Sequence, residues 1–149
     1  MYKVIGKTNT RAMRVLWAMH EIGLEFDHIK VAAQSAEAQK ANISGKVPSL
    51  ILNDIVITDS TAIVTYLADK YSQLTYPAGT IERAQQDSFT QFILDELDSI
   101  LWSAARHSFV LPKELRVSEL KDTLQWEFAK SLKILESRMN SGPNLMGEK

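Results

Sequence analysis

The sequence predicts a mixed α/β domain over residues 1–75, followed by an all-helical segment over residues 81–149. Three observations support this division. Short apolar runs alternate with helical patterns in the first part, in the order strand, helix, strand, helix, strand, strand, helix. Residues 73–80 contain a proline and a glycine and are typical of a linker. Beyond this linker only long helical periodicities remain.

The first strand and the first helix follow from the spacing of apolar residues. Residues 2–5 form a short β-prone run before a polar loop. Val15, Met19 and Ile22 then recur at intervals of four and three residues, which predicts an amphipathic helix. The N-cap candidates are Thr10 and Asn9, and the C-cap candidate is Gly23.

The remaining elements of the α/β domain include a hairpin. Residues 26–31 predict the second strand, and the parallel crossover to it is expected to be right-handed. The Ala-, Gln- and Lys-rich residues 32–42 predict a weak, exposed helix. Two apolar runs, 50–52 and 55–57, are separated only by Asn53 and Asp54, which predicts a hairpin because both residues tolerate positive φ. The last helix is expected from the capping oxygens of residues 58–60 to Tyr71.

The second part predicts two long helices, over residues 81–107 and about 114–139, separated by Pro112. Two helices bury little on their own, so their apolar stripes are expected to face each other, the first domain or another chain. Residues 140–149 show no periodicity. The apolar positions of the stripes are Phe89, Ile93, Leu97 and Ile100 in the first helix, and Leu120, Leu124, Phe128, Leu132, Leu135 and Met139 in the second.

Composition excludes several classes of function. The 149 residues include 17 basic and 18 acidic ones, so the net charge of −1 argues against nucleic acid and anionic membranes as partners. The absence of cysteine excludes disulfides, thiolate metal sites and a cysteine nucleophile. The three histidines lack metal-ligand spacing. With no membrane-length apolar run and no signal-peptide pattern, a soluble, cytoplasmic protein is expected.

Pro48 stands immediately before a strand that the pattern predicts to be central. Proline has no N–H for a ladder, so it suits the first position of a strand. Two interpretations remain open. The Val47–Pro48 bond either forms a simple trans turn, or it is cis and bends the chain so that the backbone N–H and C=O of Val47 are free for a ligand.

Two further segments each have a structural and a functional interpretation. Residues 58–61 open a helix directly after a strand, which gives either an ordinary cap or a helix N-terminus that binds a carboxylate or phosphate. The polar loop of residues 7–11 is either a connection ending in an N-cap or a source of a hydroxyl or amide donor for a thiolate or oxyanion.

Taken together, these segments closely resemble the glutathione transferase family, in a bacterial-like form of the serine/threonine type. The resemblance implies a thioredoxin-like fold for residues 1–75. Residues 81–139 resemble the first two helices of the family's helical second domain, so the resemblance covers almost the whole chain. The motifs that carry it read TRAMRVLWA at 10–18, EIGL at 21–24, GKVP at 45–48, DSTAI at 59–63 and YLADKY at 66–71.

This resemblance implies glutathione as a co-substrate, with no metal. The residue before the family's cis-proline, here Val47, would pair with the cysteinyl backbone of glutathione. The γ-glutamyl carboxylate would lie at Ser60, with Asp59 near the ammonium group. Thr8, Lys46 and Pro48 complete the implied glutathione-binding set, and Lys46 contacts either glutathione or solvent.

The family also stabilises the glutathione sulfur as a thiolate with a side chain at or before the first helix. A free thiol has a pKa of roughly 8.5, so this stabilisation is needed at neutral pH. Tyr2 lies too early for the tyrosine-type classes and the chain has no cysteine. Thr10 is therefore the first choice, with Asn9 and Thr8 as rivals. Arg11 either adds positive potential or is solvated.

The resemblance places the electrophile site between this loop and the long helix after the linker. Trp102, Arg106 and Phe109 are the candidates there, although such a cluster is also typical of a helical core. A homodimer is implied, with Asp95 or Asp98 as contacts across subunits. The chain ends before the next helix of the family's second domain, so an incomplete helical domain is expected, as a fragment, a processed product or a short natural form.

The predicted function is that of a detoxifying glutathione transferase acting on small hydrophobic electrophiles or peroxides. The alternative is a non-catalytic interaction module of the same fold, or an inactive fragment. Glutaredoxin-like thiol–disulfide exchange lacks its nucleophile because there is no cysteine.

Overall fold

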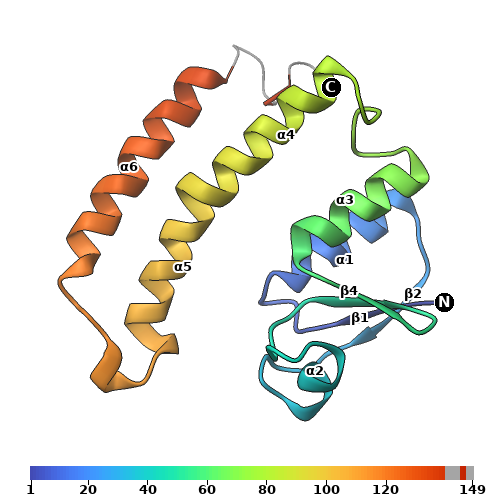
Figure 1. Ribbon diagram of the computed structural model, residues 1–149, viewed down its shortest axis with the longest axis horizontal. Helices are drawn as coiled ribbons and strands as arrows, with labels where there is room; N and C mark the ends of the chain where they lie inside the picture. Colours follow the sequence, from blue (N-terminus) through green and yellow to red (C-terminus); the bar gives the residue numbers. More distant parts are fainter. Residues whose placement is uncertain (140–144, 147–149) are drawn as a thin grey trace. The chain divides into compact units, whose positions relative to one another are not determined.

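The computed structural model describes residues 1–139, 145 and 146. The chain divides into two compact units, Met1–Thr80 and Ile81–Lys149 (Figure 1). The predicted aperiodic tail, residues 140–149, lies outside the described residues except for Leu145 and Met146.

A four-stranded mixed sheet forms the centre of the first unit. Its strands are β1 (Tyr2–Ile5), β2 (Phe26–Ile29), β3 (Ser49–Leu52) and β4 (Ile55–Thr58). Their order in the sheet is β2-β1-β3-β4, with β1 parallel to β2 and antiparallel to β3. β3 and β4 form the predicted antiparallel hairpin, and Asn53 takes a positive φ of 54° in its turn.

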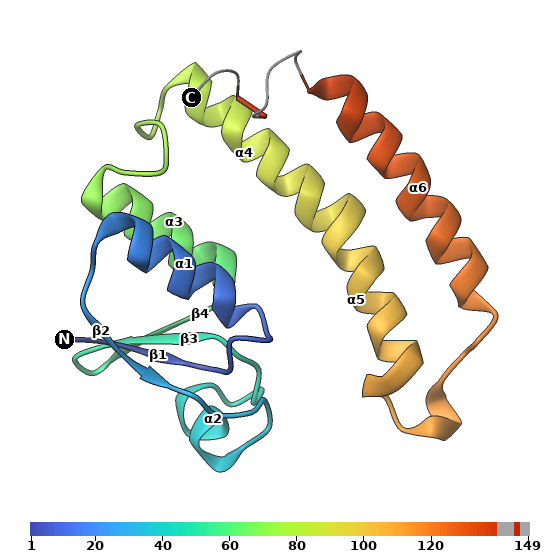
Figure 2. The ribbon, with the colours of Figure 1, turned by 180° about the vertical axis from the view of Figure 1, so that it is seen from behind.

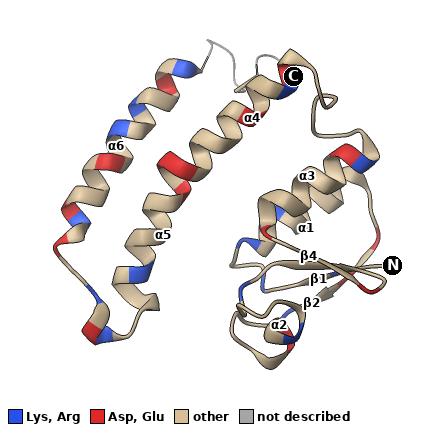
Figure 3. Cartoon of the chain, viewed as in Figure 1, with Lys and Arg blue, Asp and Glu red and all other residues tan. Residues whose placement is uncertain are grey.

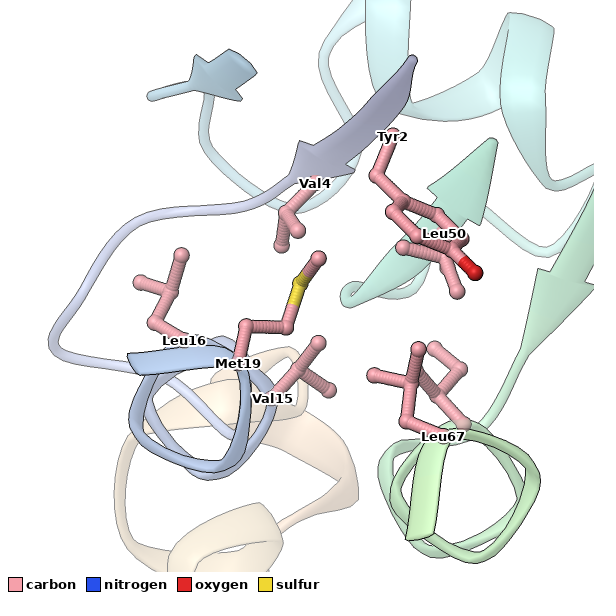
Figure 4. Close-up of a cluster of buried hydrophobic side chains, with 8 residues drawn as sticks. Tyr2, Val4, Val15, Leu16, Met19, Leu50 and Leu67 are labelled. Atoms are coloured by element: carbon pink, nitrogen blue, oxygen red, sulfur yellow. The ribbon is translucent and has the colours of Figure 1, made fainter. Parts of the chain in front are cut away.

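Two helices, α1 (Ala12–Ile22) and α3 (Ser60–Tyr71), lie side by side on one face of the sheet. The short helix α2 (Ala36–Ala41) lies on the other face (Figures 1 and 2). The core fills the layer between the sheet and α1 and α3 (Figure 4). The predicted thioredoxin-like order of elements is confirmed. The buried core side chains are Tyr2, Val4, Val15, Leu16, Met19, Leu50, Ile63 and Leu67.

Several boundaries differ from the prediction. β2 ends at Ile29 rather than at residue 31, and α2 begins only at Ala36 because Ser35 caps it by accepting a hydrogen bond from the N–H of Ala38. Arg11, not Thr10 or Asn9, occupies the N-cap position of α1. Gly23 ends α1 as predicted, in the left-handed region with φ 78°.

The second unit is a helical hairpin. Its first arm comprises α4 (Ile81–Ile93), the π-helical segment η1 (Leu94–Asp98), α5 (Ser99–Ala105) and a second π-helical segment, η2 (Arg106–Val110). The first helix therefore continues past the predicted end at residue 107. A 3₁₀ turn, η3 (Lys113–Leu115), precedes α6 (Leu120–Arg138), so the second helix begins later than the predicted residue 114.

Polar contacts join the two arms of this hairpin. Arg138 donates to the hydroxyl of Ser88 over 3.0 Å, and its guanidinium lies 4.5 Å from the ring centroid of Phe89. Ser131 donates to a carboxylate oxygen of Glu96 over 3.0 Å. Figure 3 shows acidic and basic residues distributed along α6. Of the stripe predicted to be buried, Leu132 and Met139 are exposed instead.

A cluster of three tyrosines around Lys70 ties the start of β1 to the end of α3. The Lys70 ammonium donates to the hydroxyls of Tyr2 (2.8 Å) and Tyr66 (3.2 Å), and the Tyr2 and Tyr71 hydroxyls lie 3.0 Å apart. Burial raises the pKa of Tyr2, and the hydrogen bonds to Tyr2 and Tyr66 raise the pKa of Lys70.

These two shifts predict a loss of stability at alkaline pH. The folded state holds protons that the unfolded chain releases, so the stabilisation is complete below about pH 10 and falls as the pH rises through the folded pKa values. The free energy of unfolding, measured by denaturant melts between about pH 8 and 11, should therefore decline above pH 10. Tyr2→Phe should show a shallower decline, and equal slopes in both proteins would contradict this account.

Candidate functional site

Three segments of the first unit lie at the same end of the strands β1, β3 and β4. The strand register pairs Ile5 at the end of β1 with Ser49 at the start of β3, and Ser49 with Thr58 at the end of β4. The loop after β1, the bend before β3 and the start of α3 are therefore neighbours. These are the three segments for which the sequence predicts a binding role.

Gly6 brings the first two of these segments into contact. It takes a φ of 135°, and a Cβ atom at this position would lie 3.0 Å from the Cβ atoms of both Ala12 and Val47. Only glycine allows this approach without a shift. The packing sets the start of α1 and the residue before Pro48 on either side of one backbone position.

The bend before β3 contains a cis Val47–Pro48 peptide bond. The spacing of the sequence left this isomer open, whereas the family resemblance implied it. Within the described part of the chain, neither the N–H nor the C=O of Val47 has a hydrogen-bond partner. Lys46 is exposed, and its backbone carbonyl accepts a 3.2 Å hydrogen bond from the side chain of Asn42.

The start of α3 combines a cap with an unused hydroxyl. Asp59 is the N-cap, and its Oδ1 accepts hydrogen bonds from the N–H groups of Thr61 (2.8 Å) and Ala62 (3.1 Å). Ser60 is only 2% exposed, and its Oγ is buried without a hydrogen-bond partner among the described residues. A buried polar atom without a partner is uncommon, so this hydroxyl at a helix N-terminus has a hydrogen-bonding capacity that the described residues leave unused.

The three polar candidates of the loop after β1 differ in their hydrogen bonding. The Thr10 hydroxyl donates to the carbonyl of Lys7 over 2.7 Å and accepts from the N–H of Ala12 over 3.2 Å. The side chains of Thr8 and Asn9 are exposed and have no hydrogen bond within the described residues. The proton of Thr10 is thus already engaged, while Thr8 and Asn9 have donors to offer.

The three electrophile candidates belong to the second unit. Trp102 lies in α5 and is half-buried, whereas Arg106 and Phe109 lie in η2. The guanidinium of Arg106 is exposed and donates to the Ser103 hydroxyl over 3.3 Å. Phe109 is 71% exposed, so it is not part of a core in this unit.

Two residues that contact the loop after β1 in the structure, His28 and Gly6, were not among the site residues predicted from the sequence. His28, considered there only as a metal ligand, has its Nε2 2.7 Å from the carbonyl oxygen of Gly6. One signal was available in the sequence: His28 follows Phe26 by two residues in β2, so both side chains lie on the same face of the strand. In the sheet, His28 is paired with Val4 of β1. Gly6, between a strand and a loop, also carried a signal, because such a position often requires a close backbone approach.

Other classes of site find no support among the described residues. No group of three histidine, aspartate or glutamate side chains there could hold a metal ion. None of the helices in that part of the chain combines the length and the apolar character needed to cross a membrane.

Comparison with known proteins identifies relatives of the first unit and of the fold. Residues 10–75 match the family described as glutathione S-transferase, N-terminal domain. Glutathione S-transferase Z2 of Arabidopsis thaliana is 39% identical over 67 residues, which make up 42% of this chain and 30% of that protein. The chain therefore spans less than a third of the length of this curated relative.

Solved structures match over almost the whole chain. The glutathione transferase of Methylococcus capsulatus str. Bath has a TM-score of 0.83 at 26% identity, covering 100% of this chain and 75% of that one. The glutathione transferase URE2P6 of Phanerochaete chrysosporium, solved in complex with oxidized glutathione, has a TM-score of 0.83 at 24% identity, covering 99% and 72%. The second likeness concerns the fold alone.

Proposed function

We propose that the first unit, which belongs to the glutathione S-transferase family by its match over residues 10–75, binds glutathione and activates the thiol. The thiolate would attack a small hydrophobic electrophile or a peroxide. With a carbon electrophile, the sulfur forms the new C–S bond and the leaving group departs with the electron pair of the bond that breaks.

The observation that carries this proposal is the unpartnered Ser60 hydroxyl at the N-terminus of α3. A γ-glutamyl carboxylate bound there would accept a hydrogen bond from Ser60 Oγ and benefit from the partial positive charge of the helix end. The exposed carboxylate of Asp59 would lie beside the ammonium group of the same γ-glutamyl residue. Both ends of that amino acid would then meet complementary groups.

The backbone of Val47 supports a second contact. Its N–H and C=O are unpaired within the described residues. An extended peptide such as glutathione could therefore form two hydrogen bonds with Val47, in the way that an added strand pairs with a sheet. Pro48 directs β3 away from this position and donates no competing N–H. The exposed Lys46 would add positive charge beside the carboxylates of the tripeptide.

The sulfur contact is proposed to come from the loop after β1. A thiolate near neutral pH needs hydrogen-bond donors, because the free thiol has a pKa of about 8.5. Thr8 and Asn9 have unengaged donors, whereas the Thr10 hydroxyl already donates to Lys7. We therefore assign the sulfur contact to Thr8 or Asn9, and to Thr10 the role of shaping the loop.

This assignment predicts different effects for three substitutions. Thr8→Val or Asn9→Ala, whichever removes the sulfur donor, should raise the pKa of the bound glutathione thiol by about 1, as followed by the ultraviolet absorbance of the thiolate. Thr10→Val should instead lower the free energy of unfolding by about 1 kcal/mol, because it removes the hydrogen bond that the hydroxyl accepts from the N–H of Ala12. If Thr10→Val alone raises the thiol pKa at unchanged stability, Thr10 is the sulfur ligand.

Calorimetric titration with glutathione and S-methylglutathione tests the proposed function. S-methylglutathione keeps the backbone groups that Val47 and Ser60 would bind but lacks the thiol. Saturable binding of both ligands, one per chain, together with conjugation of an activated aryl halide or reduction of an organic hydroperoxide, is the expected result. Binding without turnover would point to a non-catalytic binding module, and no binding of either ligand would overturn the proposal.

We propose that the second unit binds both the electrophile and a partner subunit. Exposed aromatic surface at Phe109 supports an apolar substrate there, with Arg106 in the same π-helical segment and Trp102 in the preceding helix α5. Exposed Leu101 supports a homodimer formed through α4 and α5, with Asp95 or Asp98 as contacts to the partner. Sedimentation equilibrium measures this association. We propose a detoxifying role from the likeness to glutathione transferases, and a cytoplasmic location, which the cysteine-free composition suits.

A further inference from the structure

Gly6, the residue after β1, is attached to β2 through both its N–H and its C=O, which belong to two successive peptide groups. The N–H of Gly6 donates to the carbonyl of Ile29 over 3.0 Å, and the carbonyl of Gly6 lies 2.7 Å from Nε2 of His28. A carbonyl oxygen only accepts, so Nε2 carries the hydrogen of this bond. Ile29 continues the regular pairing of β1 with β2, whereas His28 adds a side-chain bond that the ladder does not supply.

The loop after Gly6 continues this chain of hydrogen bonds. The carbonyl of Lys7 accepts from both the N–H (3.2 Å) and the hydroxyl (2.7 Å) of Thr10, and that hydroxyl accepts from the N–H of Ala12. Thr8 and Asn9 lie inside this closed turn. Their positions therefore depend on how the Gly6–Lys7 peptide, which contains the Gly6 carbonyl, is held.

We propose that His28 is a positioning residue for the thiol-activating loop: by holding the Gly6 carbonyl, it fixes where Thr8 and Asn9 present their donors. Thr8 and His28 line the same surface groove of about 870 Å³ beside α1, which places the histidine close to the loop that it would orient. The inference rests on the proposed glutathione-dependent function. His28 itself touches neither glutathione nor the electrophile in this account.

The expected effect is confined to the sulfur end of the site. Val47 packs at the α-carbon of Gly6 but makes no hydrogen bond with the carbonyl that His28 holds, and Ser60 belongs to α3, so the binding of the glutathione backbone does not require the His28 bond. Loss of the bond lets the Gly6–Lys7 peptide rotate while the N–H of Gly6 stays bonded to Ile29, and the donors of the loop then no longer converge on the sulfur. Catalysis suffers because a donor must be held in place before the reaction.

Three variants of the full chain test this inference. His28→Leu removes the donor, His28→Gln restores an N–H at a comparable distance from the backbone, and His20→Leu is the matched control. His20 lines the same groove, but its ring packs edge-on against Phe26 and holds no loop carbonyl within the described residues. The measurements are the affinity for S-methylglutathione, the pKa of the bound glutathione thiol from its ultraviolet absorbance, and the turnover number.

In His28→Leu the affinity for S-methylglutathione should stay within about twofold, while the thiol pKa rises by about 1 and turnover falls about tenfold. His28→Gln should recover most of both losses, and His20→Leu should show neither. An unchanged thiol pKa in a His28→Leu protein that still binds S-methylglutathione would overturn the inference alone, as would a His28→Gln protein no better than His28→Leu. A wild-type protein that binds neither glutathione nor S-methylglutathione would overturn the proposed function and this inference with it.

Discussion

Replacing Gly6 with alanine is expected to lower the free energy of unfolding by about 3 kcal/mol, from overpacking and an unfavourable backbone conformation together. The new Cβ would lie 3.0 Å from the Cβ atoms of both Ala12 and Val47, and neither neighbour is the end of a flexible side chain. The φ of 135° adds a conformational penalty that any residue with a side chain would incur. Denaturant unfolding followed by circular dichroism measures this change.

Gly23→Ala separates the two contributions to the Gly6 effect. Gly23 also has a positive φ, 78°, but no atom lies within 4 Å of the place that its Cβ would take. This control should therefore cost only about 1 kcal/mol, the penalty for the left-handed conformation. Equal losses in the two variants would mean that the close approach of Gly6 to Ala12 and Val47 contributes nothing.

Replacing Ser60 with alanine should weaken glutathione binding about 10- to 100-fold with no loss of stability. A hydrogen bond to a charged group contributes about 1.5–3 kcal/mol, and the bound carboxylate would lose one. The unliganded protein loses nothing comparable, because Ser60 Oγ is buried without a partner there. Removing such an atom leaves the free energy of unfolding unchanged or slightly higher.

Ser49 provides the matched control for Ser60. Its Oγ is also buried and without a partner among the described residues, but Ser49 is the first residue of β3, where the alternation of side chains directs it away from the face occupied by Leu50. Ser49→Ala should leave the calorimetric affinity for glutathione unchanged. If Ser60→Ala lowers stability while the binding per folded molecule is retained, Ser60 acts as part of the helix start and not as a ligand.

The order of elements in the first unit was predictable because each one carries a local signal. The hairpin follows from Asn53 and Asp54, and the end of α1 from Gly23, which adopts the left-handed conformation as predicted. The boundaries that the prediction missed depend on longer-range packing or on competing caps. Ser35 shortens α2 in this way, and the two π-helical segments lie within a helical pattern that gave no sign of them.

The candidate site was predictable in its segments but not in the use of its side chains. The sequence shows that Thr8, Asn9 and Thr10 are polar, but only their hydrogen bonds show which hydroxyl is engaged. Asp59 and Ser60 are adjacent capping residues in the sequence, yet one caps α3 and the other is buried and unused. The contact between His28 and Gly6 joins residues 22 positions apart, which no local pattern reveals.

The cluster of Tyr2, Tyr66, Lys70 and Tyr71 lies at the start of β1 and the end of α3, whereas the proposed glutathione site lies at the end of β1 and the start of α3. Along α3 the rise from Ser60 is about 9 Å to Tyr66 and about 16 Å to Tyr71. Substitutions that far apart combine additively in their free energies. Stability and ligand recognition of the first unit can therefore be engineered independently. Substitutions in the tyrosine–lysine cluster would change the free energy of unfolding, whereas substitutions at the other end of α3 would change ligand affinity.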